Sequence, residues 1–120
     1  MNDGVVYDRS FKFAIRIVNA YKFLTYDQRE FVISKQLLRS GTAIGALCAE
    51  AKYAQSRADF INKMHIALKE ASETEYWLNV LKSTDYIEEK IYMSIIEDCK
   101  QLIKLLVSIV KTSKKTVEKV

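Results

Sequence analysis

The chain has 120 residues, of which 49% are hydrophobic and 28% are charged, and its formal net charge is +4. This composition excludes a disordered chain, and at this length a single domain can bury about two thirds of its unfolded surface without disulfides. The sequence has no proline and only three glycines, so little in it interrupts helix formation.

The first predicted helix covers about residues 8–24 and carries two apolar stripes. One stripe consists of Phe11, Ala14, Ile15, Val18 and Tyr21, and the other of Phe13, Ile17, Ala20 and Leu24. Residues three and four apart share one side of a helix, so two such stripes make an apolar face wider than a lone surface helix needs. We therefore expect part of this face to be buried against another copy of the chain, although ordinary core filling is the alternative.

The second predicted helix covers about residues 27–53 and contains a block of small side chains. Nine of the twelve residues from Ser40 to Ala51 are Ser, Gly, Thr, Ala or Cys, which lets two helix backbones approach closely. Glu50 lies within this block. An unpaired buried charge is costly, so we expect Glu50 to be buried against a basic group, either Arg39 or a side chain of a neighbouring subunit.

The third predicted helix covers about residues 57–83, with Ser56 as its N-cap and Asp59 in the capping-box position. The fourth covers about residues 87–112, followed by a short basic tail. Its apolar stripe consists of Ile87, Ile91, Ile95, Cys99, Leu102, Leu106 and Val110. Short connections make neighbouring helices antiparallel, so the sequence predicts an all-α, up-down-up-down four-helix bundle that forms one domain over residues 1–120.

Positive charge is concentrated in the first half of the chain. Residues 1–58 hold nine Lys or Arg against five acids, whereas residues 59–110 hold six against nine. Arg9, Lys12 and Arg16 are three and four residues apart, and Lys35 and Arg39 are four apart, so each set shares one helix face. These five residues are the candidate nucleic-acid contacts, through backbone phosphates. A solvated helix face is the alternative.

Other functional classes find little support. The only histidine, His65, lies three residues after Asn62, so the Glu-x-x-His pairs of di-iron bundles are absent. The sequence shows no metal-ligand cluster, no catalytic triad and no phosphate-binding glycine loop, and we predict no enzyme activity, metal or cofactor.

We expect the protein to be cytoplasmic. Residues 1–10 do not resemble a signal peptide, and the apolar segment 102–110 is too short to cross a bilayer. Cys48 and Cys99 fall on apolar helical stripes, which favours reduced core thiols and a reducing compartment.

Several short motifs resemble a known family. An Arg39-Ser40 pair leads into a small-residue helix that ends in Ala46-Leu47-Cys48-Ala49-Glu50-Ala51. The next helix carries Ser56, Phe60, Ile66-Ala67-Leu68, Glu70 and Glu73 to Trp77-Leu78. Over about residues 8–112 the chain resembles the four-helix-bundle proteins encoded in intervening sequences of bacterial 23S ribosomal RNA genes. Their relatives include the accessory protein (Avd) of diversity-generating retroelements.

The resemblance implies a homopentameric barrel and marks Ser40, Glu50, Phe60 and Glu70 as structural motif residues. Together with the charge distribution, it favours a non-enzymatic homo-oligomer that binds structured RNA or another nucleic acid. The alternative is a protein-protein scaffold, or an accessory subunit of a nucleic-acid enzyme such as a reverse transcriptase. A helix-turn-helix DNA reader is a third hypothesis, disfavoured because no recognition helix with base-reading residues is evident.

Overall fold

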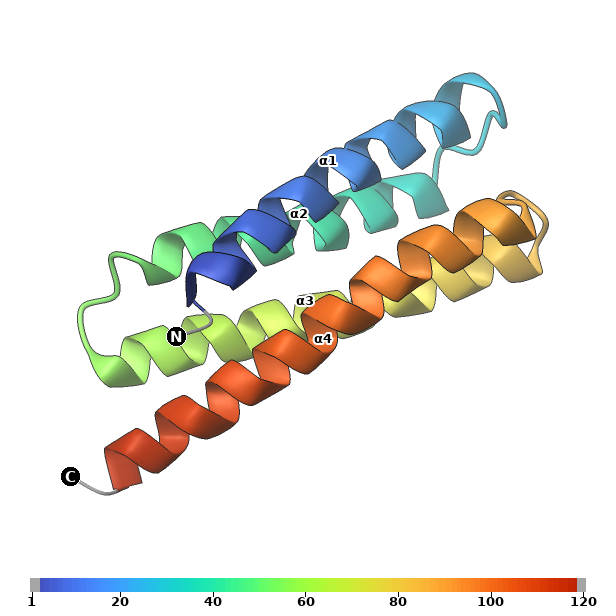
Figure 1. The fold of residues 1–120 in the computed structure, drawn as a ribbon. Helices are drawn as coiled ribbons and strands as arrows, with labels where there is room; N and C mark the ends of the chain where they lie inside the picture. Colours follow the sequence, from blue (N-terminus) through green and yellow to red (C-terminus); the bar gives the residue numbers. More distant parts are fainter. Residues whose placement is uncertain (1–2, 119–120) are drawn as a thin grey trace.

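The computed structural model describes residues 3–118, which form four α-helices and no strands. The helices are α1 (Asp3–Tyr26), α2 (Ile33–Ala51), α3 (Arg57–Ser83) and α4 (Glu89–Glu118). Figure 1 shows the chain turning back at each loop, so that the helices lie side by side in an elongated bundle. In this bundle α2 packs against both α1 and α3, and α4 packs more closely on α3 than on α1. The prediction of an all-α fold is confirmed.

All four helices contribute to the core. The side chains of Ile17, Ile44, Leu78 and Leu106, one from each helix, are completely buried. Of the two stripes predicted on α1, the one that contains Ile17 faces this core, whereas the other carries the exposed side chains of Phe11 and Ile15. A single chain therefore covers this second apolar stripe of α1 only in part.

Both cysteines are free core residues, as predicted. Cys48 and Cys99 are completely buried and are not joined by a disulfide. Burial raises the pKa of the Cys48 thiol to about 11 and that of the Cys99 thiol to about 12. The thiolate is the reactive form of cysteine, so both side chains behave as small apolar groups at neutral pH.

Two glycines of the small-residue block set the distance between α1 and α2. A Cβ atom added to Gly41 would lie 2.8 Å from both γ-carbons of Ile17, and one added to Gly45 would lie 3.2 Å from the backbone oxygen of Ser10. Both distances are shorter than an ordinary van der Waals contact between such atoms. The close approach of two helix backbones that the small residues predicted is therefore present.

The start of α3 follows the capping signal in the sequence. Ser56 has an extended backbone conformation, and its Oγ accepts a hydrogen bond of 3.1 Å from the backbone N–H of Asp59. The carboxylate of Asp59 accepts one of 3.1 Å from the backbone N–H of Gln55. This reciprocal pair satisfies donors that a helix start leaves without partners, and α3 has the bounds predicted from the sequence.

The start of α2 differs from the prediction. The sequence suggested a helix from about residue 27, but α2 begins at Ile33 after a loop in which Arg29 adopts a left-handed conformation, with φ of 57°. The buried carboxylate of Glu30 accepts hydrogen bonds from the backbone N–H groups of Ser34 (2.6 Å), Ile33 (2.9 Å) and Val32 (3.2 Å). It thereby caps α2, and its charge complements the helix dipole.

The remaining helix ends also differ by several residues. α1 begins five residues earlier and ends two residues later than predicted, and α4 is shifted toward the C-terminus to Glu89–Glu118. The tail that was expected to follow the fourth helix is thus helical as far as residue 118. Residues 119–120 lie outside the described part of the chain.

Gly41→Ala should destabilise the fold despite the better helix propensity of alanine. The new methyl group would collide with the buried Ile17, and overpacking of this kind costs about 1–3 kcal/mol, against a propensity gain of about 1 kcal/mol. We expect urea unfolding to show a net loss of about 1 kcal/mol. Gly4→Ala is the control, because nothing lies within 4 Å of a Cβ at Gly4. Equal stability of the two variants would contradict tight α1–α2 packing.

Glu30→Gln should destabilise the protein by about 1 kcal/mol at neutral pH, because the neutral amide accepts the three backbone hydrogen bonds less well. Burial alone would raise the pKa of Glu30, but the bonds from Ile33, Ser34 and Val32 outweigh it and hold the pKa below its ordinary value of 4.5. A lowered pKa in the folded state gives stability that is present above pH 4.5 and is lost as the pH falls through the folded-state pKa.

The difference between the wild type and Glu30→Gln should therefore shrink on acidification, as urea unfolding at neutral and acidic pH would show. Asp27→Asn is the matched control, because Asp27 lies in the same loop but is exposed. A stability gap that stays constant with pH would contradict the capping role of the ionised carboxylate.

Candidate nucleic-acid interface

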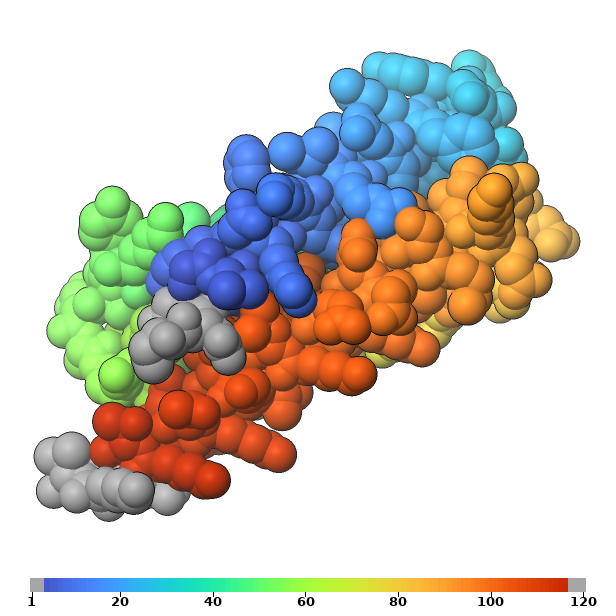
Figure 2. Space-filling model, in the orientation of Figure 1, coloured from blue at the N-terminus to red at the C-terminus, as the bar shows by residue number. Residues whose placement is uncertain are grey.

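The three candidate cations of α1 lie on the side of that helix that faces α4. Arg9, Lys12 and Arg16 line a hollow of about 500 Å³ between the two helices. Its remaining lining consists of Phe13 from α1 and Asp98, Gln101 and Leu102 from α4. With three cations and one carboxylate, the lining carries a net charge of +2 (3 − 1). Figure 2 shows α1, in blue, and α4, in orange to red, meeting along this face.

Arg16 is fixed in this hollow by α4. Its Nη1 donates a hydrogen bond of 2.7 Å to the carboxylate of Asp98 and one of 3.3 Å to the backbone oxygen of Ser94. Its Nη2 donates one of 3.0 Å to the Ser94 hydroxyl. These bonds hold the plane of the guanidinium group in one orientation, although the group remains partly exposed.

Arg9 and Lys12 are more available than Arg16. The ammonium of Lys12 lies 3.2 Å from the Asp8 carboxylate one turn earlier, but both side chains are mostly exposed, and such surface pairs contribute little. Arg9 is exposed and has no ion pair with any residue in the described range 3–118. These two cations can therefore turn toward a ligand.

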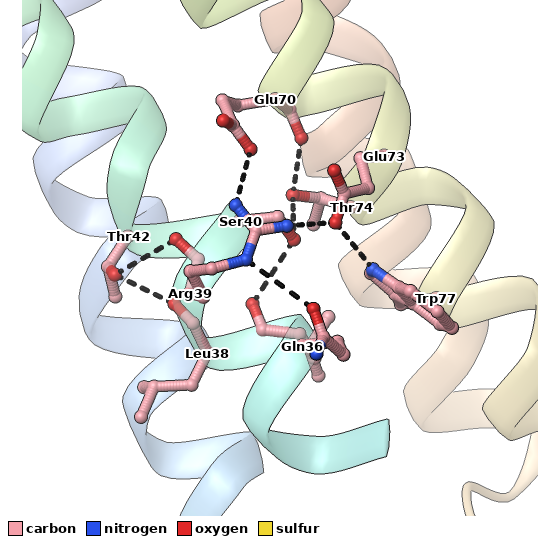
Figure 3. A network of polar contacts seen from close by, with 10 residues as sticks. Gln36, Leu38, Arg39, Ser40, Thr42, Glu70, Glu73, Thr74 and Trp77 are labelled. Carbon is pink, nitrogen blue, oxygen red and sulfur yellow. Dashed lines mark hydrogen bonds and ion pairs between the residues drawn. The ribbon is translucent and has the colours of Figure 1, made fainter. Parts of the chain in front are cut away.

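Arg39 lies on a different side of the bundle, where α2 meets α3 (Figure 3). Its Nη1 donates a hydrogen bond of 3.2 Å to Glu70, and its Nη2 forms an ion pair with Glu73. Glu73 also accepts a 2.9 Å hydrogen bond from the indole N–H of Trp77. The bonds from Trp77 and Arg39 outweigh burial and hold the pKa of Glu73 below its ordinary value. The charge of Arg39 is thus compensated within the α2–α3 contact.

Lys35 is exposed one turn before Arg39, and within residues 3–118 it has no ion pair. The five candidate residues therefore do not form one continuous surface. Three of them gather between α1 and α4, whereas Arg39 holds α2 against α3.

Two of the family-motif residues join Arg39 at the α2–α3 contact. Ser40 is completely buried and its Oγ accepts a 3.0 Å hydrogen bond from the hydroxyl of Thr74, next to the ion pair of Glu70 (Figure 3). Phe60 is buried in the core, with the guanidinium of Arg57 5.3 Å from its ring centre.

The expectation of a buried Glu50 is wrong for the single chain. Glu50 is exposed, and so are its neighbours Ala46 and Ala49. The small residues of α2 thus serve two sides of the helix: Gly41 and Gly45 face α1, whereas Ala46 and Ala49 reach the surface. Arg39, one of the expected partners of Glu50, pairs with Glu70 and Glu73 instead.

An apolar hollow between α1 and α2 was not located from the sequence. It measures about 560 Å³. It is lined by Tyr7, Asp8, Phe11, Ala14, Thr42, Gly45, Ala46, Ala49 and Lys52. Phe11 is 66% exposed at its edge, and Ile15, one turn further along α1, is 47% exposed. The wide apolar face predicted for the first helix was the sequence signal for this surface.

The described residues contain neither a candidate membrane-spanning helix nor a group of potential metal ligands. No helix within residues 3–118 combines the length and apolar character needed to cross a membrane. In the same range, no three His, Cys, Asp or Glu side chains are placed to hold a metal ion, and His65 is exposed.

Comparison with known proteins places this bundle in a family. The model of the 23S rRNA-intervening sequence protein family matches residues 2–108, almost the whole chain. The chain belongs to this family. The chain is also similar to a protein of known crystal structure from Bacteroides thetaiotaomicron VPI-5482, which is described as a protein with unknown function from the S23 ribosomal protein family. The two sequences are 62% identical. The TM-score is 0.91, and the match covers 92% of this chain and 99% of that one. None of the curated proteins compared matches this family member.

Proposed function

We propose that this protein is a non-enzymatic, homo-oligomeric helical protein that binds structured RNA through contacts to the phosphate backbone. The observation that carries the proposal is the hollow between α1 and α4, where Arg9, Lys12 and Arg16 face one surface with a single carboxylate among them. Cations that replace the counterions of a nucleic acid on binding supply most of the affinity in sequence-independent recognition.

The geometry revises the set of contacts. Arg9 and Lys12 are exposed at the hollow, whereas Arg16 is held against α4 by its bonds to Asp98 and Ser94. Arg39 is excluded from the main set because two glutamates already compensate its charge. Lys35 remains an outlying candidate on α2. The expected interface is therefore the α1–α4 side of an antiparallel, up-down-up-down bundle.

The apolar face shared by α1 and α2 supports assembly with further copies. Phe11 and Ile15 project from α1 beside the apolar hollow, which is lined by small residues such as Ala46 and Ala49. The projecting side chains of one copy could therefore pack into the hollow of another. Large exposed apolar patches mark interaction surfaces. Burial of this face in a ring, with five subunits as the family resemblance implies, would repeat the basic hollow around the assembly and strengthen its field.

The same apolar face favours a second candidate function. A scaffold, or an accessory subunit of a nucleic-acid enzyme such as a reverse transcriptase, would use this face to dock a different protein. In either case the buried, unreactive thiols of Cys48 and Cys99 fit the reducing cytoplasm in which we place the protein.

A labelled structured RNA should bind with strong salt dependence in fluorescence anisotropy. If Arg9 and Lys12 neutralise two phosphates, affinity falls about twelvefold between about 50 and 200 mM salt for each subunit engaged. The double variant Arg9→Gln, Lys12→Gln should bind more weakly and lower the slope of the log–log salt plot by about two.

The matched control removes two exposed cations elsewhere, Lys69 on α3 and Lys90 on α4, by substitution with glutamine. This control should leave the affinity close to that of the wild type. If no RNA binds even at the lower salt concentration, the protein-protein scaffold becomes the better hypothesis.

Phe11→Glu should reduce the mass of the assembly measured by light scattering. A carboxylate buried in an apolar interface without a partner costs more than the contacts of one side chain can offset. Met93→Glu is the control, because Met93 is 56% exposed on α4, away from the α1–α2 hollow. A wild-type protein that is monomeric at micromolar concentration would contradict the homo-oligomer.

A further inference from the structure

A second hollow adjoins the basic one along the α1–α4 contact. It measures about 300 Å³, and Arg16 lines both hollows. The remaining lining of the second hollow consists of Asn19, Ala20, Phe23, Leu24, Ile87, Ile91 and Ile95. Apart from Arg16 and Asn19 these side chains are apolar. The basic hollow and this apolar hollow therefore meet at Arg16.

The apolar recess exposes a side chain that the helical pattern assigned to the core. Ile91 belongs to the apolar stripe of α4, yet it is 40% exposed, whereas Ile87 and Ile95 on the same stripe are buried. Asn19 stands at the rim with an exposed side chain, and its amide makes no hydrogen bond to other residues of the described range. The second hollow thus has an exposed apolar side chain, Ile91, and a side-chain amide, that of Asn19, whose donor and acceptor are free to bond a ligand.

Arg16 gives the border a fixed planar surface. Its bonds to Asp98 and Ser94 already order the guanidinium group, so little further entropy is lost when a flat ligand stacks on it. Guanidinium planes and apolar side chains are surfaces on which proteins hold unstacked bases, and a free amide can bond to the edge of a base.

We propose that the second hollow binds one unpaired base of the RNA, while the phosphates next to that base contact Arg9 and Lys12. This inference rests on the proposed function and narrows the partner to helical RNA that is interrupted by a bulge or a loop. In such RNA the base stacks against Arg16 and the apolar floor, and the amide of Asn19 bonds to its edge. The second hollow therefore favours RNA with an extruded base, which a continuous duplex lacks.

An acidic amphipathic helix of a partner protein fits the hollow less well. Such a helix needs apolar contacts from positions i to i+7, about 10 Å, on both walls of a groove. The apolar wall of α1 runs only from Ala20 to Leu24, about 6 Å, before Arg16 and Asn19 interrupt it. A wall of this length is sufficient for a single base.

The test uses two labelled RNA hairpins that differ only by one unpaired adenosine in the stem, titrated against the whole protein. The wild type should bind the interrupted hairpin about tenfold more tightly, the effect expected for one stacked base. Asn19→Ala and Ile91→Ala should each reduce this preference, with the salt dependence unchanged. Asn62→Ala and Met93→Ala are matched controls at exposed positions outside the hollow and should keep the preference.

A second readout follows the base itself. With 2-aminopurine in place of the unpaired adenosine, wild-type binding should change its fluorescence, and the change should be smaller with Ile91→Ala. Thermal melting of each variant establishes that it is folded before titration.

Each alternative result overturns the inference in a distinguishable way. Equal affinity for the two hairpins, or a preference that survives both substitutions, removes the base site but leaves phosphate binding intact. Absence of binding to either hairpin removes the proposed RNA function as well. Binding of an acidic amphipathic peptide, titrated in parallel, without binding of the interrupted hairpin would assign the hollow to a protein helix.

Discussion

The close approach of α1 and α2 is the constraint on which the rest of the bundle depends. Because Gly41 and Gly45 have no side chains, Ile17 and the backbone at Ser10 can fill the space beside α2. On its other side α2 meets α3 through Arg39 and the buried Ser40–Thr74 hydrogen bond. α2 is thus held between two partners, whereas α4 is held mainly by α3. The looser α1–α4 contact is where the two adjoining hollows lie.

Charges are treated differently in tight and loose contacts. In the tight α2–α3 contact, Arg39 has two carboxylate partners, one of which also accepts a hydrogen bond from Trp77 (Figure 3). At the loose contact, a single carboxylate, Asp98, faces the three cations of α1. The charge of Arg39 is compensated by partners within the bundle, whereas the hollow between α1 and α4 keeps a net positive charge that a ligand can compensate.

Local signals in the sequence predicted much of the fold. Ser56 and Asp59 defined the start of α3, the small residues predicted the α1–α2 approach, and the apolar stripes placed Cys48 and Cys99 in the core. Such features depend on residues a few positions apart, or on side-chain size. The charge spacing on α1 likewise grouped three cations that do share a hollow.

Long-range contacts account for what the sequence did not reveal. Glu70 and Glu73 are more than thirty residues from Arg39, so helical spacing could not show that they compensate it. The side-chain cap by Glu30 needs a loop with a left-handed residue, which no standard motif indicated. Glu50 was expected to be buried because small residues surround it, but small residues permit close packing without requiring it. Ile91 is exposed because α1 does not cover it.

The two buried thiols give the protein a practical property. Burial raises the pKa of Cys48 to about 11 and that of Cys99 to about 12, so the thiols stay protonated at neutral pH, and neither sulfur is accessible. Maleimide reagents should therefore leave the folded native chain unmodified. A cysteine introduced on the surface would be the sole site of labelling, so distance measurements by fluorescence or spin resonance can follow each helix without removing the native cysteines.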